Sequence, residues 1–439
     1  MRFYSLLITF VVLLAACNAE GNSNSTGDTQ EPQTKTKAKT KDLVKDSKKE
    51  KMNLSAFLEI DDDHLIPFKL LKNPKEDFLI VKNGSEEIKI KDYKWNGDML
   101  NFTMPVFNSE ITATLIGENF MGEWVKNPRT EKEAKMNFHA YSNLNQNLIP
   151  PRFTDYDLQM AAGEKPDAQI GGKWSVKFSP NTDDEYPAIG EFKQDGNDLT
   201  GTFRTETGDY RFLAGKIYGE QFYLSCFDGS HAFLFNGKVD NGKITGEFFS
   251  GKTWREPYTA KKDDKAKLTN PDALTYLNNK SDKVDFSFSD LNGQNKSFDD
   301  LIAGNKALVV QIFGSWCPNC MDETRFYADL YKDYKAKGIE FVGIAYERNG
   351  TLEADKAALN KYIKELNINY PVLYAGKASK KLASEQFPML NKIISFPTTI
   401  FIDKDGKVHK VHTGFNGPAT SVYKDYVKET KALLDKLAI

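Results

Sequence analysis

Cys317 and Cys320 are the residues of this 439-residue sequence whose types and spacing best support chemistry. They lie in Leu308–Glu323, where an apolar run ends abruptly in Cys-Pro-Asn-Cys and continues as a charged, helix-favouring sequence. Two thiols at this spacing can form a disulfide with each other and exchange it with another disulfide through a thiolate. The stretch therefore indicates a redox site.

The flanking sequence predicts the elements that position the two cysteines. Residues 308–313 are apolar and rich in β-branched side chains without alternation, as in a strand covered on both faces, and Gly314-Ser315 interrupts them. From Pro318 onward, side chains of similar character recur at steps of three and four, which predicts a helix. Proline is favoured at the first helical position, so Cys317 lies at the helix start.

The helix start determines the predicted roles of the thiols. Unpaired amide groups and the positive end of the helix dipole stabilise a thiolate there, and they lower a cysteine pKa from about 8.5 to about 3.5–7.5. Cys317 is therefore the predicted nucleophile. Cys320 lies one turn further on, on the buried face of the helix, and is the predicted resolving thiol that attacks Cys317 once a mixed disulfide has formed.

The segment Phe313-Gly-Ser-Trp-Cys-Pro-Asn-Cys320 resembles the active site of the thioredoxin superfamily, in particular its TlpA/ResA-type branch of membrane-tethered extracytoplasmic thiol-disulfide oxidoreductases. The resemblance covers about residues 283–439 and implies that no cofactor is needed beyond the Cys317–Cys320 disulfide. In this superfamily a cis proline faces the dithiol, and Pro397 is the matching position. Trp316 and Phe396, the neighbours of these motif residues, are candidate substrate-binding positions.

Glu323 matches a carboxylate that TlpA/ResA-like proteins use near their dithiol for proton handling. The i, i+3 spacing puts it beside Cys320 on a helix, where a partly buried carboxylate would have a raised pKa and could exchange a proton with that thiol. The alternative is an exposed glutamate that complements the helix dipole. Thioredoxin itself has a buried acid six residues before its first cysteine, and Gln311 replaces it here, which leaves Glu323 as the main candidate proton carrier.

The N-terminus predicts export and a lipid anchor. Leu6–Ala16 is an apolar run of signal-peptide length, shorter than the about 20 residues that a membrane helix needs. It ends in Leu14-Ala-Ala-Cys17, which resembles a bacterial lipobox, so we predict a signal peptide at 1–16 and lipidation of Cys17. An ordinary cleaved signal peptide is the alternative. Asn18 stands where an inner-membrane retention signal would usually have aspartate, which favours the outer membrane, facing the periplasm.

Residues 17–52 are predicted to be a disordered tether, because Asn, Ser, Thr, Gln, Gly and Lys dominate and almost no large apolar residue is present. The lysines between Lys35 and Lys51 could contact anionic lipid headgroups, although a solvated charge run is the more ordinary interpretation. The whole chain carries 59 Lys and Arg against 61 Asp and Glu. This near balance gives no reason to expect a nucleic-acid partner.

Residues 53–262 predict an antiparallel β region. Short alternating runs are separated by turn signals such as Asp240-Asn-Gly242, a pattern typical of a sandwich or barrel. A glycine two residues before an aromatic residue recurs, as in Gly190-Glu-Phe192 and Gly201-Thr-Phe203, which indicates similar successive strands. The sequence permits one domain or two sub-domains, with a break near 148–153. Four tryptophans are expected in the core, although a ligand pocket would show the same residues: Trp95, Trp124, Trp174 and Trp254.

Cys226 and His231 flank a predicted Asp-Gly-Ser turn. Such a pair could belong to a metal site, or Cys226 could be a third redox thiol. Two ligands do not close a zinc site and free cysteines are commonly buried, so we expect Cys226 to be a core residue and predict no metal site.

After a linker at 263–282, residues 283–439 predict a thioredoxin fold. A strand at 339–345 follows the active-site helix, and the order strand, helix, strand implies parallel pairing. His409 and His412 follow the predicted cis-proline strand and are expected at the surface. The predicted architecture is thus an antiparallel all-β N-terminal region followed by an α/β thioredoxin fold.

Three kinds of function are compatible with these features. The first is a thiol-disulfide oxidoreductase that reduces disulfides of exported proteins and receives electrons from a membrane carrier of the DsbD/CcdA kind, because an exported reductant needs an electron supply. The second is a thiol peroxidase, an oxidant or an isomerase. The Pro-x-x-x-Thr-x-x-Cys arrangement of peroxiredoxins is absent, which argues against a peroxidase. Reductases commonly have proline as the second residue between the two cysteines, whereas here Pro318 is the first, which leaves an oxidant or isomerase open. The third is a ligand-binding or scaffold lipoprotein that acts through the β region.

Overall fold

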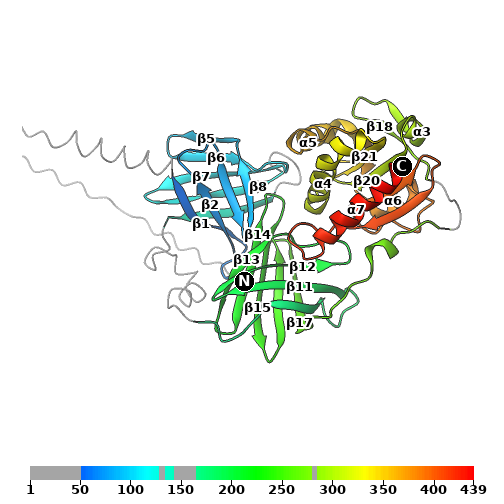
Figure 1. The fold of residues 1–439 in the computed structure, drawn as a ribbon. Helices are drawn as coiled ribbons and strands as arrows, with labels where there is room; N and C mark the ends of the chain where they lie inside the picture. Colours follow the sequence, from blue (N-terminus) through cyan, green and yellow to red (C-terminus); the bar gives the residue numbers. More distant parts are fainter. Residues whose placement is uncertain (1–50, 128–133, 143–164, 279–283) are drawn as a thin grey trace, which may run out of the picture. The chain divides into compact units, whose positions relative to one another are not determined.

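The computed structural model describes residues 51–127, 134–142, 165–278 and 284–439. The predicted signal peptide, Cys17, nearly all of the predicted tether and the break near 148–153 lie outside these ranges. The described chain consists of strands as far as residue 262 and of alternating strands and helices after residue 284 (Figure 1). The predicted fold class is confirmed: antiparallel β structure precedes a thioredoxin-like α/β domain.

The first part of the β region is an antiparallel sheet with the strand order β4-β3-β2-β1-β9-β8-β7-β6-β5. Side chains on one face of these strands, such as Leu54, Ala56 and Leu58, form a single buried core with Trp124 and Phe138. The strands are β1 (Met52–Glu59), β2 (Leu65–Lys72), β3 (Leu79–Asn83), β4 (Glu86–Ile90), β5 (Tyr93–Asn96), β6 (Met99–Thr103), β7 (Ser109–Ile116), β8 (Asn119–Lys126) and β9 (Ala134–Tyr141).

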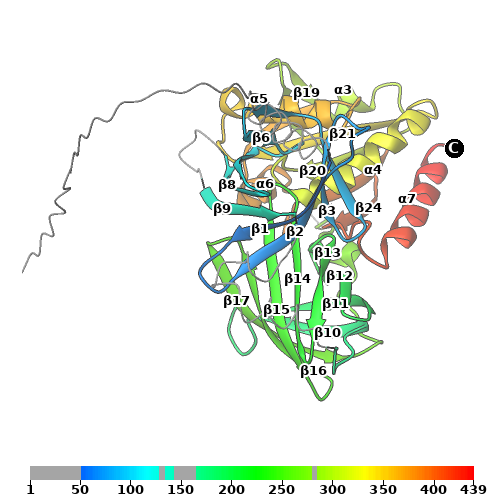
Figure 2. The ribbon, with the colours of Figure 1, turned by 90° about the vertical axis from the view of Figure 1, so that its left-hand side faces the viewer.

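The second part is a closed antiparallel barrel of consecutive strands, seen side by side in Figure 2. Aromatic side chains, among them Phe178, Phe203, Phe235 and Tyr258, fill its interior. The strands are β10 (Gly172–Phe178), β11 (Tyr186–Asp195), β12 (Asp198–Thr205), β13 (Leu213–Tyr218), β14 (Gln221–Phe227), β15 (Ala232–Asp240), β16 (Lys243–Ser250) and β17 (Trp254–Lys262).

The recurring glycines of the barrel have a steric reason. Gly201 in β12 pairs with Phe192 in β11, and a Cβ atom at Gly201 would lie 2.2 Å from the carbonyl oxygen of Glu191 and 2.8 Å from the Phe192 ring. Phe192 is buried in the barrel core, so its ring has little room to move. Glycine is therefore required at Gly201, where a Cβ atom would collide with the backbone of β11 and with the Phe192 ring.

The buried residues of the β region mostly follow the sequence expectation. Trp124 and Trp174 are buried, and Cys226 is a free, fully buried thiol in the barrel core. The prediction is wrong for Trp254, whose side chain is 56% exposed. This residue begins β17, where the strand has left the packed interior, and its Nε1 donates a hydrogen bond to Oε1 of Glu256 at 3.1 Å.

The α/β domain has a sheet with the strand order β19-β18-β22-β21-β20-β23-β24. As predicted, β20 and β21 pair in parallel, while β23 runs antiparallel to β20. The elements are η2 (Pro271–Ala273), β18 (Ser287–Asp290), β19 (Asn295–Ser297), α3 (Phe298–Ile302), β20 (Ala307–Phe313), α4 (Pro318–Lys335), β21 (Ile339–Glu347), α5 (Leu352–Glu365), β22 (Val372–Lys377), α6 (Lys380–Gln386), β23 (Thr398–Asp403), β24 (Val408–Thr413) and α7 (Tyr423–Leu437).

Helices cover both faces of this sheet, and the side chains of β20 alternate between the two cores. Val309 and Phe313 contribute to the core that contains α4, α5 and α7. Leu308 and Val310 contribute to the other core, which contains α3 and α6. The central strand is consequently buried along its whole length, which explains the continuous apolar run before the cysteines.

His412 is not at the surface, contrary to the prediction. Its side chain is buried because the short helix η2 lies across β24, and His412 Nδ1 is 2.7 Å from Oδ1 of Asp272. His409 faces Asp403 across the same hairpin at 2.8 Å. Within the described ranges, no helix is both long and apolar enough to cross a membrane.

The glycine packing generates a stability prediction. Gly201→Ala should lower the free energy of unfolding by about 1–3 kcal/mol, because the added methyl group forces β11 and β12 apart. Urea unfolding followed by fluorescence measures the change. Gly171→Ala is the matched control, since a Cβ at Gly171 has its nearest neighbour at an ordinary 3.7 Å. Equal stability of the two variants would contradict the steric argument.

Candidate functional site

The dithiol lies where β20 ends and α4 begins. Cys317 occupies the N-cap position of α4, its Sγ accepts a hydrogen bond from the backbone amide of Cys320 at 3.2 Å, and Pro318 takes the first helical position. Cys317 and Cys320 form a disulfide with a Cα–Cα distance of 5.2 Å. Cys317 is 7% exposed and Cys320 is fully buried. The sulfur that another molecule can approach is thus the one at the helix N-terminus, where a thiolate is stabilised.

The loop before β23 lies opposite the dithiol. The peptide bond between Phe396 and Pro397 is cis, and the Sγ of Cys317 is 3.6 Å from the carbonyl oxygen of Phe396. Trp316 packs edge-on against Phe396 with a centroid distance of 6.0 Å, and its Nε1 donates to the carbonyl oxygen of Tyr346 at 2.9 Å. The structure therefore brings the predicted substrate-binding residues together with Pro397 around Cys317.

Glu323 is fully buried in the first turns of α4, so the exposed alternative does not describe it. Burial raises its pKa to about 7, although hydrogen bonds from neighbouring side chains act in the opposite direction. These donors are Gln311 Nε2 at 2.9 Å, Tyr426 Oη at 3.2 Å and Tyr327 Oη at 3.3 Å. A carboxyl group with this pKa can both take up and release a proton near neutral pH.

A second buried carboxyl group, Glu347, was missed by the sequence analysis. It ends β21 and accepts hydrogen bonds from the backbone amide of Ser315 at 2.7 Å and from the Ser315 hydroxyl at 2.8 Å. Burial raises the pKa of Glu347 to about 7. The parallel pairing contained a signal, because Ala345 pairs with Phe313 and a residue two positions further must lie beside the turn that precedes Cys317.

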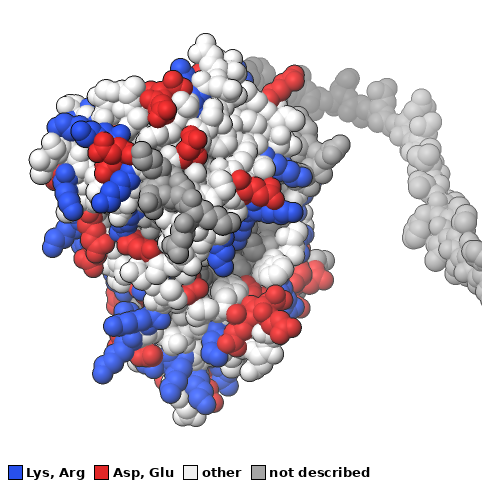
Figure 3. Space-filling view, turned by 90° about the vertical axis from the view of Figure 1, so that its right-hand side faces the viewer, with Lys and Arg blue, Asp and Glu red and all other residues white. Residues whose placement is uncertain are grey.

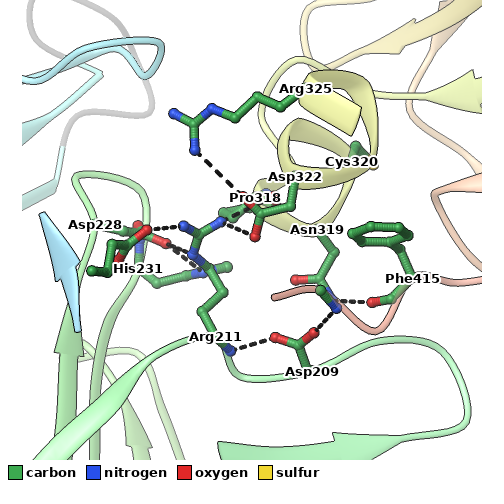
Figure 4. A network of polar contacts seen from close by, with 12 residues as sticks. Asp209, Arg211, Asp228, His231, Pro318, Asn319, Cys320, Asp322, Arg325 and Phe415 are labelled. Carbon is green, nitrogen blue, oxygen red and sulfur yellow. Dashed lines mark hydrogen bonds and ion pairs between the residues drawn. The ribbon is translucent and has the colours of Figure 1, made fainter. Parts of the chain in front are cut away.

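Arg211 connects the barrel to the start of α4 (Figure 4). No motif in the sequence predicted this contact. The side chain is 1% exposed, and its Nη1 donates to the carbonyl oxygen of Pro318 at 3.3 Å and to Asp322 Oδ2 at 2.6 Å. Two further carboxylates hold the same guanidinium: Glu86 bonds Nη2, and Asp228 Oδ2 lies 3.3 Å from Nε. One buried cation thus joins the first sheet, the barrel and α4.

The barrel rim, defined here as residues 205–211 and 228–231, makes further contacts around the dithiol. The carboxylate of Asp209 accepts hydrogen bonds from the backbone amides of Arg211 and Gly417. The hydroxyl of Ser395 donates to the carbonyl oxygen of Thr207 at 3.2 Å, and that of Ser230 donates to the carbonyl oxygen of Trp316 at 3.3 Å. The rim therefore meets the cis-proline loop and the residue before Cys317.

A cavity of about 480 Å³ lies between the barrel rim and the α/β domain, residues 284–439. It is bordered by Asn319, which stands between the two cysteines, and by Phe396, which precedes the cis proline. The lining residues are Tyr186, Pro187, Thr205, Glu206, Thr207, Gly208, Asp209, Tyr210, His231, Phe233, Asn319, Ser395 and Phe396.

Charged side chains of both signs are interspersed on the face drawn in Figure 3, with neither sign dominating it. Within the described ranges, no group of three or more His, Cys, Asp or Glu side chains is arranged to hold a metal ion.

This chain is similar to known proteins in its C-terminal α/β domain. The Redoxin family model matches residues 279–427. The thiol-disulfide oxidoreductase ResA of Bacillus subtilis (strain 168) is 30% identical over 134 residues, which cover 30% of this chain and 66% of that protein. ResA of Bacillus thuringiensis subsp. konkukian is 29% identical over 127 residues, with 28% of this chain and 62% of that protein covered. The chain spans somewhat less than two thirds of the length of these two relatives.

A solved structure is also similar: the thiol:disulfide interchange protein, thioredoxin family protein, from Chlorobium tepidum TLS. It is 27% identical to this chain, with 35% of this chain and 96% of that chain covered, and the TM-score is 0.27.

Arg211 provides a test of the contact between the barrel and α4. Arg211→Met should lower the free energy of unfolding by about 3–5 kcal/mol, because it leaves buried carboxylates without their cation. Arg255→Met is the control: Arg255 pairs with Glu247 at the surface, where such a pair contributes about 0–1 kcal/mol. Urea unfolding of both variants measures the difference. A small loss for Arg211→Met would show that the cluster does not hold the parts together.

Glu323 should make stability depend on pH. A carboxyl group whose pKa rises from 4.5 to about 7 on folding binds its proton more tightly in the folded state. Its stabilising contribution is complete below pH 4.5 and is lost as pH rises through 7, by at most about 1.4 kcal/mol per pH unit. Glu347 contributes in the same direction. Glu323→Gln should therefore reduce, but not abolish, the fall of the unfolding free energy between pH 4.5 and 7. An unchanged slope in urea unfolding experiments would contradict this prediction.

Proposed function

We propose that this chain, which is similar to ResA thiol-disulfide oxidoreductases and matches the Redoxin family model over residues 279–427, is a TlpA/ResA-like member of the thioredoxin superfamily. We infer that it catalyses thiol-disulfide exchange at Cys317 and Cys320 and reduces the disulfides of exported proteins. One arrangement carries the proposal: a disulfide opens a helix, its outer sulfur faces a cis proline, and its inner sulfur is buried. An outer sulfur at a helix N-terminus attacks, and an inner one resolves.

The proposed reaction begins with the reduced pair. The Cys317 thiolate attacks one sulfur of the substrate disulfide and forms a mixed disulfide, and the other substrate sulfur leaves as a thiolate that takes up a proton from solvent. Cys320 then gives its proton to Glu323 and attacks the Sγ of Cys317. The second substrate sulfur leaves and is protonated in turn. The substrate gains two electrons, and the Cys317–Cys320 pair is oxidised.

Glu323 is the proposed proton acceptor for Cys320, and Gln311 is the proposed positioning residue. The Gln311 Nε2 lies 2.9 Å from the Glu323 carboxylate and 3.5 Å from the carbonyl oxygen of Cys320, so it contacts both ends of this helical turn. The Oε1 of the same amide accepts a hydrogen bond from Thr324 at 2.9 Å, which fixes its orientation.

The direction of exchange requires an external reductant, since each cycle leaves the pair oxidised. We propose a membrane electron donor of the DsbD/CcdA kind. Lipidation of Cys17 and the tether at 17–52 would keep the domain at the bacterial cell envelope, facing the periplasm and attached to the outer membrane. The support for the envelope location is the apolar run followed by Leu14-Ala-Ala-Cys17, and the support for the outer membrane is Asn18.

The redox potential of the Cys317/Cys320 pair in the full chain tests the direction. We expect a value near that of thioredoxin, about −270 mV, from equilibration with glutathione or dithiothreitol. A value near about −120 mV would make the protein an oxidant. If the Cys317/Cys320 pair showed no reversible two-electron couple, the proposed thiol-disulfide exchange itself would be contradicted.

The role of Glu323 is tested by the rate of the second step. Glu323→Gln should slow release of the substrate from the mixed disulfide by about 10²-fold at about pH 8. In the wild type that rate should rise with pH through 7, because the ionised carboxylate accepts the proton. Glu347→Gln is the matched control, since Glu347 has the same raised pKa but contacts Ser315 instead of lying on the helix of Cys320. If Glu347→Gln alone lost the pH dependence, the proton acceptor would be Glu347, and the role proposed for Glu323 would be contradicted.

A further inference from the structure

The cavity at the barrel mouth, between the barrel rim and the dithiol, is not needed for thiol-disulfide exchange as such. Its volume of about 480 Å³ lies within the range of about 300–1,000 Å³ that is usual for sites of small ligands. Asn319, Ser395 and Phe396 form one side of it, and all three belong to the surroundings of Cys317. A group bound in this cavity would therefore lie next to the reacting sulfur.

We propose that the barrel mouth is a substrate subsite that binds an aromatic side chain beside the cysteine of an extended, uncharged or cationic peptide segment. The inference rests on the proposed thiol-disulfide exchange and specifies its substrate class. The barrel would thus select which disulfides reach Cys317.

The inner wall of the cavity is aromatic. The ring of Tyr210 lies 5.4 Å from that of Phe233, edge to face, and His231 stacks on Phe233 at 4.2 Å. The hydroxyl of Tyr210 is 3.0 Å from that of Tyr186, which donates in turn to the buried carboxylate of Glu256 at 2.8 Å. These contacts hold the rings in place, and a fixed aromatic wall favours an aromatic partner in edge-to-face or offset packing.

The barrel interior below this wall is already occupied. Phe203, Phe235 and Phe248 stack on one another with centroid distances of 4.5 and 4.4 Å, and all three are buried. A ligand consequently stays at the mouth, close to Asn319 and Phe396, instead of entering the barrel.

The charge of the lining indicates the sign of the ligand. The lining contains two carboxylates, Glu206 and Asp209, and neither lysine nor arginine. Asp209 is already bonded to backbone amides, whereas Glu206 makes no hydrogen bond or ion pair with the residues that the structure describes. Glu206 is thus available to a cationic group. An anionic disulfide such as oxidised glutathione would meet a negative charge without compensation.

The contacts of the barrel rim exclude bulky partners. Thr207 is bonded to Ser395, Ser230 is bonded to Trp316, and Asn319 donates to the carbonyl oxygen of Phe415 at 3.2 Å. With these contacts in place Cys317 is 7% exposed. The surface of a folded protein cannot approach this sulfur closely, whereas a single extended segment can enter beside it.

Charge reversal at Glu206 tests the subsite in the full chain. Two synthetic peptides with the same disulfide and the same phenylalanine are compared, one flanked by lysine and the other by glutamate. We expect the wild type to reduce the lysine peptide with the higher kcat/KM. Glu206→Lys should lower the ratio of the two kcat/KM values by about tenfold, since one charge near the ligand changes sign.

Glu123→Lys is the matched control, because Glu123 is an exposed strand residue of β8 that does not line the cavity. Identical peptide ratios in Glu206→Lys, Glu123→Lys and the wild type would overturn the subsite and leave thiol-disulfide exchange intact. Failure of the wild type to exchange with dithiothreitol as well as with both peptides would instead overturn the proposed function and, with it, the inference. A phenylalanine-lysine peptide without cysteine should inhibit the wild type competitively, and inhibition that is equal in Glu206→Lys would count against the subsite.

Discussion

The burial of Arg211 is the constraint on which the arrangement around the dithiol depends. A guanidinium that is 1% exposed must keep its charge, and its ionic partners come from the first sheet, the turn after β14 and α4. Separation of any one of them would leave charges uncompensated in an apolar environment, which costs several kcal/mol. The same guanidinium also bonds the carbonyl oxygen of Pro318 at the first turn of α4. The part of the helix that carries the dithiol is thereby fixed relative to the barrel.

Burial raises the pKa of two carboxyl groups near the dithiol, Glu323 and Glu347, to about 7, but their surroundings differ, and the difference separates their roles. Glu347 takes both hydrogen bonds from Ser315, so it holds the turn that delivers Cys317 to the helix start. Glu323 shares the helix of Cys320 and takes its hydrogen bonds from side chains, among them Gln311 and Tyr327, instead of from the loop before Cys317. A proton can therefore leave Glu323 without distorting the loop, whereas ionisation of Glu347 acts directly on the loop geometry.

The site was predictable from the sequence to the extent that its parts are local. The strand, the break at Gly314, the proline after Cys317 and the i, i+3 spacing of Glu323 all lie within sixteen consecutive residues, Leu308–Glu323, where periodicity and capping rules apply. Arg211 and Asp322 are 111 positions apart, and nothing in either neighbourhood encodes the contact. The predictions of burial for Trp254 and of exposure for His412 were wrong for the same reason. The position of Trp254 at a strand end and the helix η2 that crosses His412 determine their exposure.

The filled interior of the barrel limits where the barrel can bind a ligand or another chain. A closed barrel has no free strand edge to pair with another chain, and its aromatic core leaves no room for a ligand inside. The rim of the barrel is bonded to the cis-proline loop, to Trp316 and to α4. A scaffold function in isolation would not require those contacts. Barrel and dithiol are therefore best understood as two walls of one site, in which the redox domain supplies the reacting sulfur and the barrel restricts what reaches it.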